Sequence, residues 1–193
     1  SSKTNMLNYL GVHYIDLMRF ITEAVPKRVS AMGQDYYLNG VGVNTYDAIQ
    51  CSIEWENVNN KTFIQTIFTN WVDPDTSTSA SDQKIKLIGT NGRFESDQKN
   101  RGLYLNVDTK SPKSINPYFC SSYKNSRGLL QWSGYGIDSI IDFLDSASSL
   151  ISGRIKLEDI PKSKPSFTES IYSTSVLQAA QKSLNSESAW IEL

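Results

Sequence analysis

Histidine and cysteine are scarce in this sequence, and their scarcity limits the chemistry that the chain can perform. The 193 residues contain a single histidine, His13, and two cysteines, Cys51 and Cys120, which stand far apart. Zinc sites need clustered cysteine and histidine ligands, so we expect no metal site. Free cysteines are among the most buried residues. We therefore expect two buried thiols, in a protein of the reducing cytoplasm.

An excess of charge of either sign and long hydrophobic runs are also missing. Nineteen basic residues face twenty acidic ones, giving a net charge of -1. Nucleic acids and anionic membranes are bound by concentrated basic surfaces, so neither is an expected partner. No apolar run approaches the roughly 20 residues that cross a bilayer. The apolar content of 39% is enough for the core of one domain, expected over residues 1–193.

The first element that the sequence predicts is a helix from Met6 to Thr22, ended by Pro26. Apolar residues and the histidine recur there at spacings of three and four, which predicts one buried stripe. The expected stripe consists of Met6, Leu10, His13, Leu17 and Ile21. The chain opens within a few residues of this helix, so we expect it to be part of a larger protein.

Two further helices are expected near the end of the chain. Apolar spacing predicts one over 137–151, with Gly153 as its C-terminal stop. A capping box at Ser166 and Glu169 predicts the start of another, which runs to about Leu184.

The middle of the sequence is rich in predicted strands. Residues 47–55 alternate, with Ile49, Cys51, Ile53 and Trp55 on one face and Gln50, Ser52 and Glu54 on the other. Such alternation indicates a sheet with one covered face. The Asn91-Gly92 pair predicts a tight hairpin. Further strands are expected at 28–37, 62–69, 84–88, 93–96, 103–107 and 189–193, with loops at 71–83 and 108–128. The fold class is α+β: an open, largely antiparallel sheet with helices packed on one face.

His13 is the residue of greatest chemical interest. In a helix it shares a face with Tyr9, and Asp16 follows one turn later. Imidazole can take a proton from an alcohol near neutral pH, which suits oxidation of a hydroxyl group. The alternative is a buried, hydrogen-bonded histidine with a structural role. Asp16 and Arg19 are expected to form a local ion pair.

Two loop segments are further candidates for a binding site. Trp71, Asp73 and Asp75 lie at the mouth of a loop and either contact a substrate or form a solvated turn. The segment 40–45 carries two glycines, but an alternating strand pattern follows it. A dinucleotide loop opens a helix instead, so no cofactor-binding residues are expected in this chain.

The order of elements resembles the glucose–fructose oxidoreductase and inositol dehydrogenase family (Gfo/Idh/MocA). Residues 10–19, LGVHYIDLMR, resemble that family's histidine-bearing helix. Residues 84–95 resemble its strand–GTxG–strand hairpin, and 173–193 its last helix and strand. Phe143 stands where the family places an FLxAI helix. The four stretches follow in the family's order over nearly the whole chain.

The resemblance implies the C-terminal domain of an NAD(P)-dependent oxidoreductase that acts on a sugar, polyol or related hydroxyl compound. An N-terminal Rossmann domain, absent here, would bind NAD or NADP and supply a catalytic lysine. His13 would be the general base, and Tyr9, Asn8, Trp71 and Tyr135 would line the substrate pocket. The family's acidic partner of the histidine is replaced by Tyr9. A homo-oligomer would form through the sheet face of Gln50, Ser52 and Glu54.

Two other functions remain open at the level of sequence. The replacement by Tyr9 suits a non-catalytic relative of the same fold that serves as a binding or assembly domain. An independent interaction domain with a similar pattern is the third possibility. The upstream sequence separates the three, because only an oxidoreductase needs both a glycine-rich βαβ segment and the lysine.

Overall fold

The computed structural model describes residues 4–73, 82–97, 102–107, 110–115, 121–160 and 164–193 and divides into two compact units. The first unit comprises residues 1–74 and 161–193, and the second residues 75–160. Whether they form the expected single domain stays a prediction. In the described part of the chain, no helix has the length and apolar character that a membrane span requires.

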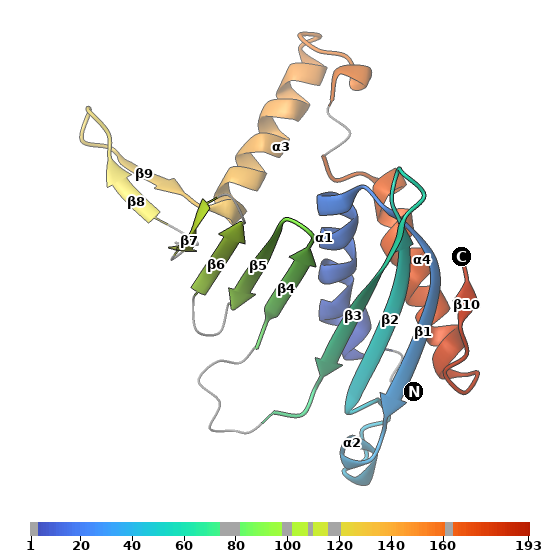
Figure 1. The fold of residues 1–193 in the computed structure, drawn as a ribbon. Coiled ribbons are helices and arrows are strands. Elements are labelled where there is room, and N and C mark those ends of the chain that lie inside the picture. The colour runs from blue at the N-terminus through green and yellow to red at the C-terminus, as the bar shows by residue number, and fades with distance from the viewer. Residues whose placement is uncertain (1–3, 74–81, 98–101, 108–109, 116–120, 161–163) are drawn as a thin grey trace. The chain divides into compact units, whose positions relative to one another are not determined.

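The first unit is an antiparallel sheet with helices on one side (Figure 1). Its strand order is β10-β1-β2-β3, and all neighbours are antiparallel. The strands are β1 (Val25–Gln34), β2 (Ala48–Glu56), β3 (Thr62–Asn70) and β10 (Ile191–Glu192). The helices are a π turn (Leu7–Gly11), α1 (Val12–Thr22), α2 (Tyr37–Gly40) and α4 (Phe167–Leu184). The expected fold class, α+β with a largely antiparallel sheet, is confirmed.

The core of this unit lies between the sheet and the pair α1 and α4. The alternation in β2 is confirmed: Ile49, Cys51, Ile53 and Trp55 are all buried. Burial raises the pKa of the Cys51 thiol to about 12, because the thiolate would lose its hydration. Cys51 is therefore the buried free thiol that the sequence predicts, whereas Cys120 lies outside the described residues.

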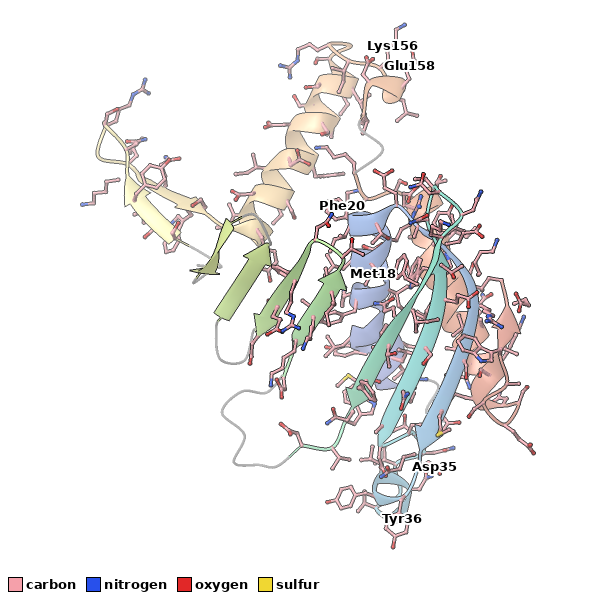
Figure 2. The ribbon with its side chains drawn as sticks, in the orientation of Figure 1. Met18, Phe20, Asp35, Tyr36, Lys156 and Glu158 are labelled. Atoms are coloured by element: carbon pink, nitrogen blue, oxygen red, sulfur yellow. The ribbon has the colours of Figure 1, made fainter. Side chains whose placement is uncertain are left out.

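The first helix forms over 7–22, as expected, but it buries a different face. Its buried residues are Leu7, Gly11, Ile15 and Met18. The expected stripe was wrong, since His13 and Ile21 are exposed. Gly11 lies on this buried face, where a Cβ would lie only 2.6 Å from Leu7 Cδ1, so a larger residue would force the Leu7 side chain to move. Figure 2 labels Met18 of the buried face and Phe20 of the outward face.

Arg19 ties the two helices together. Its Nε donates to Glu169 Oε2 of α4 over 2.9 Å, and its guanidinium lies 4.5 Å from the centre of the Tyr172 ring. The expected local pair with Asp16 is therefore wrong, because Arg19 reaches across to α4. Ser166 does cap α4, accepting from the Glu169 amide over 3.2 Å, but the Glu169 carboxylate serves the interhelical ion pair.

The second unit has a sheet, a hairpin and one long helix. The sheet order is β4-β5-β6-β7, and β8 pairs with β9. Helix α3 (Tyr135–Ile151) ends before Gly153, whose φ of +69° makes it the expected helix stop. A single 3-10 turn follows at Leu157–Asp159. The strands are β4 (Lys84–Gly89), β5 (Gly92–Asp97), β6 (Gly102–Val107), β7 (Lys110–Ile115), β8 (Ser121–Lys124) and β9 (Leu130–Ser133).

Two expectations for this unit need correction. The segment 108–128 was expected to be a loop, but it contains β7 and β8, whose polar sequences give no apolar alternation. The 84–97 hairpin forms, but Gly89 pairs with Gly92, so its turn is centred on Thr90 and Asn91. The positive φ that motivated the prediction is absent from this turn.

Candidate functional site

The site is built on the start of the first helix, where the backbone is irregular. Asn5 is buried and begins the helix: its Oδ1 accepts from the Asn8 amide over 2.9 Å, and its carbonyl accepts from the Tyr9 amide over 3.1 Å. An asparagine in this place satisfies amides that have no partner inside the helix. The π turn over Leu7–Gly11 follows. Single π turns within helices are frequent at functional sites.

Tyr9 projects from this π turn and stacks on Trp71, which directly follows β3. The ring centroids are 5.7 Å apart and the planes differ by 29°. Both rings keep accessible surface: Tyr9 is 61% exposed and Trp71 38%. The Trp71 amide donates to the Asp47 carbonyl over 2.8 Å, which fixes the start of the loop. The expected pocket residues Tyr9 and Trp71 are thus brought together as a partly open aromatic surface.

His13 lies one helical turn after Tyr9 on the outward face of α1. This face carries Tyr9, His13, Asp16 and Phe20, all exposed. Within the described residues the imidazole has no hydrogen-bond partner, so the structural alternative, a buried and bonded histidine, is wrong. An accessible imidazole next to an aromatic surface is able to exchange a proton with a bound hydroxyl group.

Asp47 is a residue that the sequence did not single out, although it braces this region. Its carboxylate is buried and accepts from the amides of Tyr36, Tyr37 and Leu38 over 2.8, 2.7 and 2.7 Å. These three bonds hold the pKa of the Asp47 carboxyl below its usual range, and the bond from the Leu38 amide has the largest effect. One residue therefore fixes both Trp71 and the start of α2. The role of Asp47 could not be predicted, because hydrogen bonds to main-chain amides some ten residues away leave no pattern in a sequence. The role of Asn5 could have been, because asparagine is a preferred residue at the start of a helix.

The other expected site residues fall in different places. Asn8 is half-buried in the π turn, beside Tyr9. Asp73 is exposed after Trp71, and Asp75 lies outside the described residues. Tyr135 begins α3 in the second unit, and its place in the pocket stays a prediction. Tyr14 follows His13, and burial raises its pKa, so its phenol keeps its proton at neutral pH.

Segment 40–45 does not have the arrangement of a dinucleotide loop. Segment 40–45 follows the short helix α2 and leads into strand β2, whereas a dinucleotide loop connects a strand to the helix that receives the pyrophosphate. The segment therefore lacks the strand–loop–helix order of that motif, and where a nicotinamide cofactor binds stays a prediction.

Residues 3–95 match the family model described as the GFO/IDH/MocA C-terminal domain. Several solved structures share the fold. An oxidoreductase from Sinorhizobium meliloti is 14% identical, with a TM-score of 0.67 over 96% of this chain and 52% of that one. An inositol dehydrogenase homolog from Azotobacter vinelandii, complexed with NADH and myo-inositol, is 13% identical, with a TM-score of 0.60 over 97% and 50%.

The transcriptional regulator Gal80p from Kluyveromyces lactis also shares the fold. It is 14% identical, with a TM-score of 0.63 over 98% of this chain and 46% of that one. The chain therefore spans about half the length of the solved proteins that it matches. No curated protein sequence matches it. At such identities the likeness concerns the fold, and the same fold hosts different functions.

Proposed function

Because residues 3–95 belong to the GFO/IDH/MocA C-terminal domain family, we propose that the chain is the substrate-binding domain of an NAD(P)-dependent oxidoreductase. Its substrate would be a sugar, a polyol or a related hydroxyl compound. The observation that carries this proposal is the exposed His13, one turn from the Tyr9–Trp71 stack and without a hydrogen-bond partner among the described residues. The dehydrogenase homolog with myo-inositol and NADH supports the substrate class.

His13 acts in this proposal as the general base. Its imidazole takes the proton of the substrate hydroxyl, a role that a positioned histidine side chain can play. The Tyr9–Trp71 surface holds the apolar face of the substrate, and the half-buried Asn8 offers an amide to its hydroxyl groups.

The nicotinamide cofactor, NAD or NADP, is proposed to bind an N-terminal Rossmann domain, since segment 40–45 does not fit it. When bound, it would accept a hydride from the carbon that carries the hydroxyl. The same proposal assigns the protein to the cytoplasm, in agreement with the free thiol of Cys51.

A homo-oligomer is proposed through the open face of the first sheet, the face away from α1 and α4. The expected residues Gln50, Ser52 and Glu54 lie on this face between two more apolar strands. Register pairs Gln50 with Met32 on β1 and with Phe68 on β3. Met32 is 64% exposed and Phe68 74%. Exposed apolar side chains in neighbouring positions favour a protein contact.

A non-catalytic binding or assembly role is the second candidate. Tyr9 occupies the position that resembles the family's acidic partner, and its ring is engaged with Trp71. The regulator Gal80p, which shares the fold, supports this candidate. Both candidates use the same surface and differ in whether His13 moves a proton.

Turnover by the full-length protein tests the proposal. We expect oxidation of at least one compound in a panel of sugars and polyols with NAD or NADP, and a kcat lower by about 100-fold or more in His13→Asn. KM should change little, because the Tyr9–Trp71 surface remains. Lys61→Gln, in the exposed β2–β3 turn, is the control for an exposed polar substitution outside the proposed site.

Two outcomes would decide against catalysis. Unchanged kcat in His13→Asn would exclude His13 as the proton carrier. Saturable binding of the same compounds without any turnover by the unmodified protein would favour the non-catalytic candidate.

A further inference from the structure

A concave feature lies in the first unit, apart from the surface formed by His13, Tyr9 and Trp71. It is a hollow of about 400 Å³ in the first unit, here called the polar hollow. Pockets of this size accommodate small molecules. Its lining residues come from the start of the chain, the end of β1, α2, the loop before β2, and α4: Thr4, Asn5, Asp35, Asn39, Asn44, Thr45, Tyr46 and Gln181. Figure 2 shows Asp35 and its neighbour Tyr36 at the end of β1.

The backbone around the polar hollow is held by hydrogen bonds. Thr45 Oγ1 donates to the Thr4 carbonyl over 3.0 Å, which joins the loop to the start of the chain. The Val43 amide donates to the Leu38 carbonyl over 2.8 Å. The Asp47 carboxylate fixes the start of α2 through the three bonds described above. The Tyr46 ring packs against Gly33, where a side chain would collide with it. The hollow is therefore preformed, which lowers the cost of ordering on binding.

Several polar groups in the hollow remain available to a ligand. Within the described residues, the carboxylate of Asp35, the carboxamide of Asn44 and the hydroxyl of Tyr46 have no hydrogen-bond partner. Gln181 donates from Nε2 to Asn185 Oδ1 over 3.3 Å, and this leaves its own oxygen free. Carboxamides both donate and accept hydrogen bonds, while a carboxylate only accepts. Hydroxyl groups of a ligand, which also donate and accept, match this combination.

The charge of the lining residues limits the class of ligand that can bind. Among the described residues that line the hollow, Asp35 is the one charged group, and none is basic. Phosphorylated and carboxylated ligands need a cationic partner and would be repelled by Asp35. One carboxylate is too few for a calcium site, which uses several oxygen ligands with more than one carboxylate.

We propose that the polar hollow is a second binding site, which takes a neutral sugar or polyol and is separate from the surface around His13. Asp35 and Asn44 provide the main hydrogen bonds to its hydroxyl groups, and Tyr46 provides one more. This proposal does not depend on His13 having a catalytic role, because it concerns binding alone.

The test is a titration of the ¹⁵N-labelled 193-residue chain with glucose, maltose and myo-inositol, followed by NMR. We expect saturable shifts of the side-chain amide signals of Asn39, Asn44 and Gln181, with a Kd of about 1–10 mM, as suits a few hydrogen bonds in an open site. Glucose 6-phosphate should bind at least about tenfold more weakly, because it meets Asp35 and no cation.

Two variants and a matched control locate the site. Asp35→Asn keeps the shape of an exposed side chain, and Asn44→Ala removes a carboxamide; each should weaken binding about fivefold or more, since each loses a hydrogen bond. Asn59→Ala, in the exposed β2–β3 turn, should leave the Kd unchanged. Unperturbed backbone signals elsewhere confirm that each variant is folded.

Three results would overturn the proposal. These are no saturable shift with any of the three neutral compounds, tighter binding of glucose 6-phosphate, or an unchanged Kd in both variants. Shifts confined to Tyr9 and Trp71 would reject the polar hollow while supporting the proposed substrate surface. If turnover depends on His13 and no residue of the polar hollow shows a saturable shift, the proposed function stands and the second binding site is rejected.

Discussion

Gln65 of β3 donates from its Nε2 to the main-chain carbonyl of Tyr14 in α1 over 2.9 Å, while its Oε1 accepts from the Trp55 indole over 3.0 Å. Both side chains are buried in the core. A buried amide with partners at both ends resists sliding of the helix along the sheet, because movement would leave polar groups unpaired. Since Tyr14 follows His13 directly, this bond fixes how His13 is presented.

Replacing Gln65 by Leu should therefore destabilise the protein. The indole of Trp55 would be left buried without a hydrogen-bond partner, at a cost of roughly 1–3 kcal/mol in the free energy of unfolding. Urea denaturation measures this loss. Gln131→Leu, at an exposed position of β9, is the matched control, with an expected change within about 0.5 kcal/mol. Equal effects of the two substitutions would show that the buried network does not contribute.

Tyr9 is expected to act through its ring. Tyr9→Phe keeps the stack on Trp71 and should leave KM of the full-length protein within about twofold. Tyr9→Ala removes the stack, and because an aromatic pair contributes about 0.5–1.5 kcal/mol, KM should rise roughly threefold to tenfold. Steady-state kinetics on the same substrate measures both. A large fall in kcat for Tyr9→Phe would instead mean that the phenol hydroxyl takes part in proton transfer.

Asp47 should make stability depend on pH. Its pKa is lowered in the folded protein, so its contribution is complete above the unfolded value of about 4 and disappears as the pH falls through the folded value. Asp47→Asn should lower the thermal midpoint at pH 7 by more than about 3 °C. The difference from the unmodified protein should shrink below pH 4. Differential scanning calorimetry from pH 7 to pH 2 measures it.

Asp35→Asn is the control for this pH series, because that exposed carboxylate makes no hydrogen bond within the described residues. Its thermal midpoint should follow that of the unmodified protein at every pH. A constant difference between Asp47→Asn and the unmodified protein down to pH 2 would contradict the role of the carboxylate charge.

The strands of the first unit were predictable because burial on one face leaves a period of two in the sequence. Ile49, Cys51, Ile53 and Trp55 show that period, and all four are buried. The first helix was predicted in the right place with the wrong face, since apolar residues surround it on several sides. Gly11, which faces β3, contributes nothing to a hydrophobic pattern.

The contacts that organise the site were not predictable in the same way. Arg19 has an acidic residue three positions away at Asp16, but the folded chain brings Glu169 closer. Gln65 and Asp47 act through main-chain groups, which any residue supplies, so neither bond leaves a pattern of residue types. His13 could be selected from sequence because it is the single histidine, whereas its accessibility followed only from the structure.

The open face of the first sheet provides the last prediction. Met32, Ile64 and Phe68 are exposed there on strands that flank β2, and Phe68 is 74% exposed. If two copies bury this face against each other, Phe68→Glu introduces a charge that the contact cannot solvate. The full-length protein should then change from an oligomer to a monomer in sedimentation velocity. Val58→Glu, at an exposed apolar position in the β2–β3 turn, should leave the oligomer intact. An unchanged mass in Phe68→Glu would place the oligomer contact on another surface.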